Sequence, residues 1–326
     1  MPLISIIVPC FNNEKYVEKC LDSINQQSFK DFEVIIINDG STDNSKEIIE
    51  HFIKTKPNYH LINQKNMGVS TARNNGLKLV KGEFVCFVDA DDYIESNYLK
   101  ELYKAIKETH SDLCICSVVH EDLNGNTVFL DKLESLTLTN IETANLKKLI
   151  WGYACNKLYK TAIIKKNHIL FKKDIKFAED ELFYLNYLFT IKHVCMISDV
   201  LYHYVRQKQS ATKNTTNMDV QVNRFDSRRQ IIELLAKNNV DQYVINKHII
   251  ACIDTCLLVL AYKFKDKKLE KKQKLVFLDY IKKNKSIYLN DNSINWKAKF
   301  YLKMACSCLP LYIPIRRFQL KLTKRI

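Results

Sequence analysis

Short runs of β-branched residues alternate with amphipathic segments through the first third of the chain, and this order constrains the fold more than any other feature. Strand character is found in 4–8, 33–38, 59–63, 84–88 and 113–119. Between these runs, apolar side chains recur at helical spacing, as in 17–24 and 99–106. Strands that alternate with helices carrying one apolar stripe predict an α/β fold with a doubly wound, mostly parallel sheet.

The pattern changes further along the chain. Residues 112–130 place Asn124-Gly125 between two alternating stretches, which predicts a hairpin. From about residue 218 the strand signals stop and long Lys-rich helical patterns begin. Because 213–217 is polar and without periodicity, we expect one domain over 1–212 and a helical region over 213–326.

Charge divides the chain at the same place. Residues 1–212 contain 26 Lys and Arg against 27 Asp and Glu, net −1, whereas residues 213–326 contain 24 against 9, net +15. The total of +14 therefore arises from the C-terminal region alone. Such a region is expected to contact an anionic membrane surface or a second copy of the chain, and nucleic acid is the alternative partner.

The last thirty residues combine basic and apolar side chains. From Lys297 onward there are eight basic residues and no acidic one, interleaved with aromatic and aliphatic residues. The apolar stretch is too short to span a bilayer, and Pro310 and Pro314 are expected to break a helix through it. We expect this stretch to lie in a membrane interface, the alternative being that it packs on the preceding helices.

Two features favour the cytoplasm. The first eight residues lack a basic n-region and hold only a short apolar run, which predicts neither a signal peptide nor a membrane span. The eleven cysteines form no CxxC pair, so we interpret them as buried, reduced thiols rather than zinc ligands.

Acidic residues follow two of the predicted strands, where an open parallel sheet binds its ligands. The second strand ends in Asn38-Asp39, and the fourth continues into Asp89-Ala-Asp91-Asp92. Three carboxylates in four residues repel one another unless a cation neutralises them, so a divalent ion, Mn²⁺ or Mg²⁺, holding a diphosphate is the economical explanation. The alternative is that they cap the helix predicted to begin near Glu95.

Other nucleotide-binding folds lack their signature here. No Gly-rich turn follows the first strand, and neither GxGxxG nor GxxxxGKS occurs in the chain. Dehydrogenases of the dinucleotide-binding type and P-loop nucleotidases are therefore excluded.

Five segments in order and spacing resemble the family 2 glycosyltransferases of the GT-A fold. They are Ser5-Ile-Ile-Val-Pro9-Cys-Phe-Asn12, Ser23-Ile-Asn-Gln-Gln27, Asn38-Asp39-Gly40-Ser41-Thr42-Asp43, Asn66-Met-Gly68 through Ala72-Arg73-Asn74, and Asp89-Ala-Asp91-Asp92. Segments around Trp151, Asn156-Lys157, Glu179-Asp180 and Tyr202-His203 through Arg206 look like downstream parts of the polysaccharide-building branch, and the resemblance ends near Thr212.

The resemblance implies a metal-dependent inverting transfer of a sugar from a nucleotide-diphosphate donor, with a UDP-sugar favoured, to a hydroxyl of a glycan or lipid-linked acceptor. Residues 1–212 would be the nucleotide-sugar-binding catalytic domain. Such an enzyme would work in cell-surface glycan assembly, such as capsule or cell wall, at the inner face of the cell membrane.

The same resemblance assigns the donor side. Pro9, Asn12 and Asp39 would hold the nucleotide, with Asp39 accepting the imino proton of a uracil. Arg73 would reach base or phosphate, Asp89 would lie near the ribose, and Asp91 would be the direct metal ligand, with Asp89 as a further one. Asp92 would support them. Asn38 departs from the double aspartate of the family at its first position.

The acceptor side is assigned in the same way. Asp180 would be the general base that takes the proton of the attacking hydroxyl, and Glu179 would orient the acceptor. Their position also suits the positive end of a helix dipole. His203 and Arg206 would complete the metal shell or clamp the diphosphate, the alternative being that a Tyr-rich strand simply packs the core. The residues expected to line the acceptor side are Trp151, Asn156 and Lys157.

Three other interpretations stay open at this point. The chain could be a basic nucleic-acid-binding protein, which leaves the acidic strand ends unexplained. It could be a non-catalytic sugar-nucleotide-binding module, against which Asp91 and Asp180 both count. A retaining transferase would leave Asp180 without the role of a base.

Overall fold

The computed structural model describes residues 1–139, 149, 152–207, 218–261 and 267–322. Within these, ten strands form one mixed sheet in the order β3-β2-β1-β4-β9-β6-β10-β5, with β7 paired to β6 and β8 to β10. The strands are β1 (Ile4–Cys10), β2 (Phe32–Asn38), β3 (Tyr59–Asn63), β4 (Phe84–Phe87), β5 (Tyr93–Ile94), β6 (Leu113–Glu121), β7 (Thr127–Asp131), β8 (Leu136–Thr139), β9 (Lys157–Lys160) and β10 (His193–Val205).

Parallel pairing is confirmed for the predicted strands. β1 pairs in parallel with both β2 and β4, β2 with β3, and β6 with β10. The antiparallel β9 lies between β4 and β6. The hairpin predicted around Asn124-Gly125 is also confirmed, because β6 and β7 pair in antiparallel fashion on either side of it.

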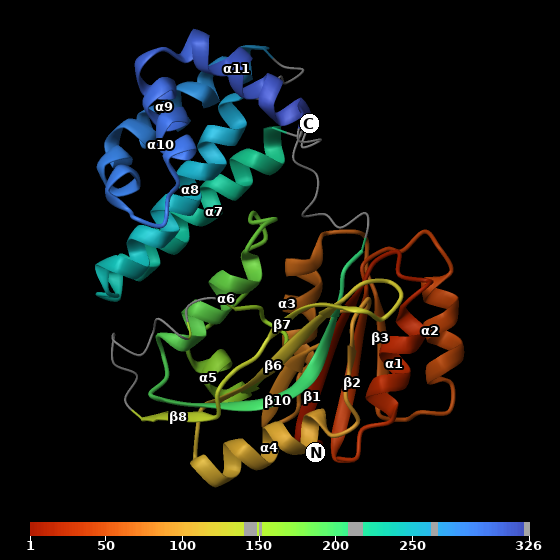
Figure 1. Cartoon of the computed structure of the whole chain (residues 1–326). Coiled ribbons are helices and arrows are strands. Elements are labelled where there is room, and N and C mark those ends of the chain that lie inside the picture. The colour runs from red at the N-terminus through yellow and green to blue at the C-terminus, as the bar shows by residue number, and fades with distance from the viewer. Residues whose placement is uncertain (140–148, 150–151, 208–217, 262–266, 323–326) are drawn as a thin grey trace. The chain divides into compact units, whose positions relative to one another are not determined.

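The helices are α1 (Val17–Asn25), α2 (Ser45–Ile53), α3 (Val69–Leu79), α4 (Tyr98–Thr109), α5 (Thr161–Lys166), α6 (Glu179–Leu188), α7 (Met218–Lys237), α8 (Gln242–Ala261), α9 (Lys267–Asn290), α10 (Trp296–Ser307) and α11 (Leu309–Leu322). The first six accompany the sheet and the last five follow it (Figure 1).

Successive side chains of a strand point to opposite faces of the sheet. Both faces of β1 are apolar, and helices pack on both. Ile4, Ile6 and Val8 of β1 share a core with the apolar stripes of α1, α2 and α4. Ile7, on the other face, is close to α3, where a Cβ on Gly76 would lie 2.6 Å from its side chain. Phe87, paired with Ile7, contacts Phe183 of α6. The sheet is therefore doubly wound, as predicted.

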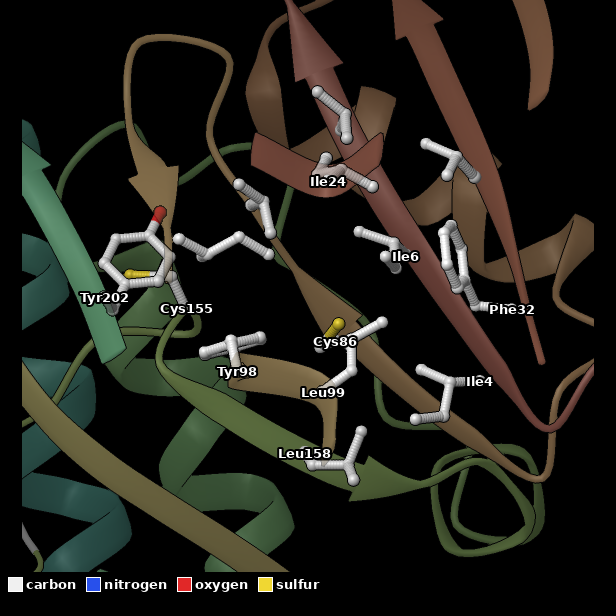
Figure 2. Packing of buried hydrophobic residues seen from close by; sticks show 14 of the residues in the cluster. Ile4, Ile6, Ile24, Phe32, Cys86, Tyr98, Leu99, Cys155, Leu158 and Tyr202 are labelled. Atoms are coloured by element: carbon white, nitrogen blue, oxygen red, sulfur yellow. The ribbon is translucent and has the colours of Figure 1, made fainter. Parts of the chain in front are cut away.

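Figure 2 shows the packing on the first of these faces. Ile4, Cys86 and Leu158 come from three strands, and Tyr98 and Leu99 of α4 lie over them. All five are 1% exposed or less. Nine of the eleven cysteines are buried thiols of this kind, while Cys306 and Cys308 are not.

The described residues divide into two compact units. One comprises 1–174 and 179–208, and the other comprises 175–178 and 209–326. The polar segment 213–217, where the sequence suggests the boundary, lies outside the described residues.

In the second unit, α8 is the central helix. It packs against α7, α9 and α11, and its apolar residues are buried along most of its length. It is the one described helix long and apolar enough to cross a membrane, but 67% of that window is buried inside the protein, as in the core helix of a helical bundle.

One prediction for this unit is wrong. Pro310 and Pro314 do not break the helix, because α11 runs continuously through both. Pro310 lies in the first turn, where its missing N–H costs nothing, and Pro314 removes a single helical hydrogen bond. Burial of Tyr312 and Leu320 on the same helix offsets that loss. Both are 1% exposed or less, and the Tyr312 hydroxyl donates to the Leu257 carbonyl of α8.

Candidate active site

The loops after β1 and β2 are fastened to each other. Asn12, in the left-handed region with φ 53°, accepts a hydrogen bond from Thr42 N at 2.8 Å, and its own N–H donates to Ser41 Oγ at 3.1 Å. Pro9 lies just before, paired with Ile37 at the end of the strands. The structure thus brings Pro9 and Asn12 together with the Asp39 loop at the carboxyl edge of the sheet.

Asp39 holds the loop that leads into α3. It is 3% exposed, and its carboxylate accepts from Gln64 Nε2 at 2.7 Å, Met67 N at 2.8 Å and Gly68 N at 2.8 Å. A carboxylate offers about four lone-pair positions, so about one is left on Oδ2 for a nucleotide base. Gly40 is required beside it, since φ is 74° and a Cβ would lie 2.7 Å from Asn66 N.

The three aspartates after β4 have different surroundings. Asp92 is 2% exposed and accepts from the Tyr202 hydroxyl at 2.7 Å and from Val205 N at 2.9 Å. Burial, together with the charges of Asp91 and Asp89, raises its pKa well above the ordinary value. Asp89 pairs with Arg73, Oδ1 to Nη2 at 2.8 Å. Arg73 therefore compensates the charge of Asp89, and burial disfavours the charged form of Asp92.

In the described structure, Asp91 has neither the cationic partner of Asp89 nor the tyrosine and backbone donors of Asp92. Gln207 Nε2 donates to its Oδ2 at 3.3 Å. Burial, and then the Asp89 carboxylate, raises the pKa of Asp91 to about 6. A half-buried carboxylate with uncompensated charge fits a hard divalent cation.

No group of three or more His, Cys, Asp or Glu side chains placed to hold a metal occurs among the described residues. Mg²⁺ and similar ions are commonly held by one or two carboxylates plus substrate phosphates, and Asp91 suits that arrangement. The alternative that the aspartates cap the next helix is wrong: β5 intervenes, and α4 begins at Tyr98 after Asn97.

Arg73 connects two parts of the site. Arg73 is 6% exposed, and its guanidinium contacts Asp89 after β4 and Glu179 at the start of α6, the latter with Nη1 3.0 Å from Oε1. Burial alone would lower the pKa of Arg73, but Asp89 and Glu179 raise it well above the ordinary value. Arg73 Nε is buried without a partner. The predicted contact with base or phosphate is untested, and the contacts present are with carboxylates.

An aromatic platform supports this arginine. Arg73 lies over the Phe171 ring at 5.1 Å, and Phe171 stacks on Phe183 of α6 with centroids 4.0 Å apart. Asn74 fixes Phe171 from both sides, accepting from its N–H at 2.9 Å and donating to its carbonyl at 2.7 Å. These contacts link α3, which carries Arg73 and Asn74, to α6 through Phe171 and Phe183.

Glu179 and Asp180 open α6, as the sequence predicts. Ala178 before them has φ 57°, a left-handed conformation that costs a non-glycine residue on the order of 1 kcal/mol and is common at functional sites. Asp180 accepts from Glu181 N at 2.8 Å. Burial, and then Glu179, raises the pKa of Asp180 to about 6, whereas Arg73 opposes the shift.

Asn156 and Lys157 lie together beside a small cavity. Lys157 is 2% exposed, and its Nζ donates to Tyr153 O at 2.7 Å and Asn156 Oδ1 at 2.8 Å, below the Tyr184 ring of α6. Burial lowers its pKa to about 8. The cavity, of about 30 Å³, has room for a water and includes Asp131 in its wall. Trp151, assigned to the same side, lies outside the described residues.

His203 and Arg206 lie at the end of β10. The ring nitrogens of His203 are already engaged, Nδ1 at 2.9 Å from Glu121 and Nε2 at 2.8 Å from Glu95, and the ring stacks on Tyr93. A metal at His203 requires one of these contacts to open. Arg206 has an exposed side chain, and its N–H donates to Glu121 O at 2.8 Å.

The sequence did not indicate several residues of this site. Gln64 and Phe171 each hold a predicted site residue in place, yet carry no motif signal, whereas Tyr202 begins one of the matched segments. Asn74 stands inside a matched segment, and its position next to Arg73 was the signal that could have identified it.

Comparison with known proteins shows the family of this chain. The family whose profile matches is described as Glycosyl transferase family 2, and the match covers residues 5–167, half of the chain. The predicted resemblance to this family is confirmed.

Two bacterial relatives align over a similar length. The "Uncharacterized glycosyltransferase EpsJ" of Bacillus subtilis (strain 168) is 36% identical over 220 residues, which cover 65% of this chain and 64% of that protein. The "Poly(ribitol-phosphate) beta-N-acetylglucosaminyltransferase TarS" of Staphylococcus aureus (strain Mu50 / ATCC 700699) is 34% identical over 213 residues, 63% of this chain and 36% of TarS. The chain thus spans less than two thirds of either relative.

The fold is shared with a solved structure. The crystal structure of S. aureus TarS 1-349 in complex with UDP-GlcNAc matches with a TM-score of 0.71 and 24% identity, over 98% of this chain and 92% of that one. The predicted GT-A type α/β fold with C-terminal helices is therefore confirmed.

Proposed function

This chain belongs to glycosyl transferase family 2, and on that premise we propose that it transfers a sugar, with inversion, from a nucleotide-diphosphate donor to a hydroxyl of a glycan or lipid-linked acceptor. A UDP-sugar is the donor we favour. The observation that carries the proposal is the Arg73 bridge: it joins Asp89, at the donor edge of the sheet, to Glu179, next to Asp180.

The donor half of the proposal rests on the carboxyl edge of the sheet. Pro9, Asn12 and Asp39 surround the place for the nucleotide, and the lone-pair position left on Asp39 can accept an imino proton of uracil. Arg206, with an exposed side chain after β10, would contact the diphosphate. The TarS complex with UDP-GlcNAc supports the choice of donor class.

Asp91 would hold the divalent ion, Mn²⁺ or Mg²⁺, with Asp89 beside it. When bound, such an ion stabilises the negative charge that develops on the leaving diphosphate. A mannosyltransferase of Pyrobaculum calidifontis with the same fold was solved with GDP-Man and Mn2+. Asp92 keeps Asp91 in place through its own bonds to Tyr202 and Val205.

Asp180 would act as the base. Its carboxylate takes the proton of the acceptor hydroxyl while that oxygen attacks the anomeric carbon, and the bond to the diphosphate breaks on the opposite side. A pKa of about 6 leaves Asp180 ionised at neutral pH and strengthens it as a base. Glu179, fixed by Arg73, would orient the acceptor, and Asn156 and Lys157 would support its side of the site.

The other interpretations explain less. A basic nucleic-acid-binding protein accounts neither for the family match nor for the ordered carboxylates. A non-catalytic module accounts for the donor edge. It gives no role to Asp180, whose pKa is raised, or to Glu179, which Arg73 holds beside it. The acceptor proposed here, a glycan at the inner face of the cell membrane, places the enzyme in surface glycan assembly.

A donor screen tests the proposal. Nucleotide release is measured from UDP-, GDP- and dTDP-sugars with Mn²⁺ or Mg²⁺ and again after chelation, alongside nucleotide binding by calorimetry. We expect metal-dependent release of UDP. Binding without release under every condition would support the non-catalytic module, and neither binding nor release would refute the proposed donor.

A further inference from the structure

Helix α10 has two opposite faces. Leu302 and Ala305 are buried within the second unit, at 1% exposed each, whereas Trp296, Phe300, Lys303 and Ser307 are all exposed. The exposed four follow one another by four, three and four residues, so they form one stripe along the helix. Trp296 is 72% and Phe300 is 52% exposed.

Helix α11 repeats this arrangement. Tyr312 and Leu320 are buried, while Leu311, Ile315 and Phe318 are 53%, 40% and 66% exposed. These three also recur at helical spacing, and Pro314 lies among them on the exposed side. The two helices are joined at Cys308, so two apolar stripes follow each other directly along the chain.

Cations accompany the stripes, and acidic residues do not. Asp291 is the last acidic residue of the sequence, and eight Lys and Arg follow it. Lys297 and Lys303 are exposed next to Trp296 and Phe300. Two helices that contribute exposed aromatic residues and only basic charges are unfavourable to leave in water and complement an apolar layer bordered by negative charge.

We propose that the exposed face of α10 and α11, centred on Trp296, Phe300, Leu311 and Phe318, docks onto an anionic lipid bilayer surface. The apolar side chains enter the boundary between headgroups and acyl chains, and Lys297 and Lys303 stay at the level of the anionic headgroups. Each basic residue near such a surface strengthens binding about fivefold. This inference is independent of the proposed transfer reaction, because it uses no residue of the candidate active site.

The test uses the full chain and two kinds of vesicle, one of phosphatidylcholine and one containing phosphatidylglycerol. We expect co-sedimentation with the anionic vesicles at low salt, release at high salt, and none with phosphatidylcholine alone. Phe300→Ser/Phe318→Ser should weaken binding more than about tenfold, because two exposed aromatic anchors are lost. Val128→Ser/Leu130→Ser, which changes two exposed residues of β7, is the matched control and should bind like wild type.

Charge and insertion are separated by further variants. Lys297→Glu/Lys303→Glu should abolish sedimentation, whereas Lys30→Glu/Lys54→Glu, on exposed lysines of the first unit, should not. Tryptophan fluorescence should shift to the blue on anionic vesicles, and Trp296→Phe should still sediment but lose most of that shift.

Two results would overturn the proposal. One is equal sedimentation of wild type, Phe300→Ser/Phe318→Ser and Lys297→Glu/Lys303→Glu with the anionic vesicles. The other is lipid-free self-association of wild type that Phe300→Ser/Phe318→Ser abolishes, which would identify the face as a contact between copies of this chain. UDP affinity, measured on the same variants, should be unchanged, so failure here is distinguishable from failure of the proposed donor.

Discussion

Arg73 Nη1 lies 3.0 Å from Glu179 Oε1, and 106 residues of sequence separate the two. The pair joins the helix that follows the donor loop to the helix that begins with the proposed base. Arg73 is a positioning residue in this account, since it acts through Glu179 and Asp89 rather than on the reacting atoms.

Replacing Arg73 should affect both stability and the pH profile. Arg73→Met leaves the partly buried carboxylates of Asp89 and Glu179 without their partner, which should cost on the order of 3 kcal/mol of unfolding free energy. It also removes a charge that lowers the pKa of Asp180, so the acidic limb of the rate profile should move to higher pH. Arg73→Lys keeps the charge but cannot contact both carboxylates, so its stability and its acidic limb should lie between those of wild type and Arg73→Met. Chemical denaturation and rate profiles of the two variants provide the check; an unshifted limb in Arg73→Met would remove the proposed coupling.

The pH dependence of the wild-type enzyme follows from Asp180. The ionised form is the base, and its pKa is about 6, so kcat should fall about tenfold per pH unit well below 6 and level off above it. The measurement uses saturating metal and donor, which keeps the titration of Asp91 from contributing. A kcat that stays constant from pH 7 down to 5 would contradict the assignment.

The divalent ion should strengthen binding of the diphosphate part of the nucleotide and leave binding of the nucleoside almost unchanged. If Asp91 holds a divalent ion, Asp91→Ala and chelation should each weaken UDP binding, while uridine binding changes little. Calorimetry with both ligands tests this, and Asp22→Ala, an exposed aspartate of α1, is the control. Equal UDP affinity with and without metal would refute the role of Asp91.

Lys157 should impose a pH dependence on stability. Its pKa is about 8 in the folded chain against an ordinary 10.5, so between these values the unfolded state binds more protons and stability rises with pH. Relative to Lys157→Met, wild type should gain on the order of 3 kcal/mol over this interval. Denaturant titrations at several pH values measure the difference, with Lys30→Met as the exposed control. A constant difference would mean that Lys157 titrates normally.

Local patterns predicted much of this molecule. The β-branched runs identified the parallel strands, and Glu179-Asp180 marked the start of α6, because these features depend on neighbouring residues. The acidic turns also predicted which edge of the sheet binds the ligand, since parallel strands bring their carboxyl ends together.

Features set by distant contacts could not be predicted in this way. Asp89 pairs with Arg73, and Asp92 accepts hydrogen bonds from Tyr202 and Val205, so the argument that the triplet requires a cation holds most directly for Asp91. The continuity of α11 through Pro314 depends on packing against α8, which local propensity does not contain. Both outcomes are tertiary effects that override a sound local rule.

The central claim is that Asp180 is the base of an inverting sugar transfer. The most direct test compares turnover and UDP affinity for wild type, Asp180→Asn and the exposed control Asp22→Asn. The account predicts that Asp180→Asn loses about 10² to 10⁴ in turnover while binding UDP like wild type, because a positioned base contributes in that range and takes no part in donor binding. An Asp180→Asn enzyme that keeps most of its turnover would contradict it.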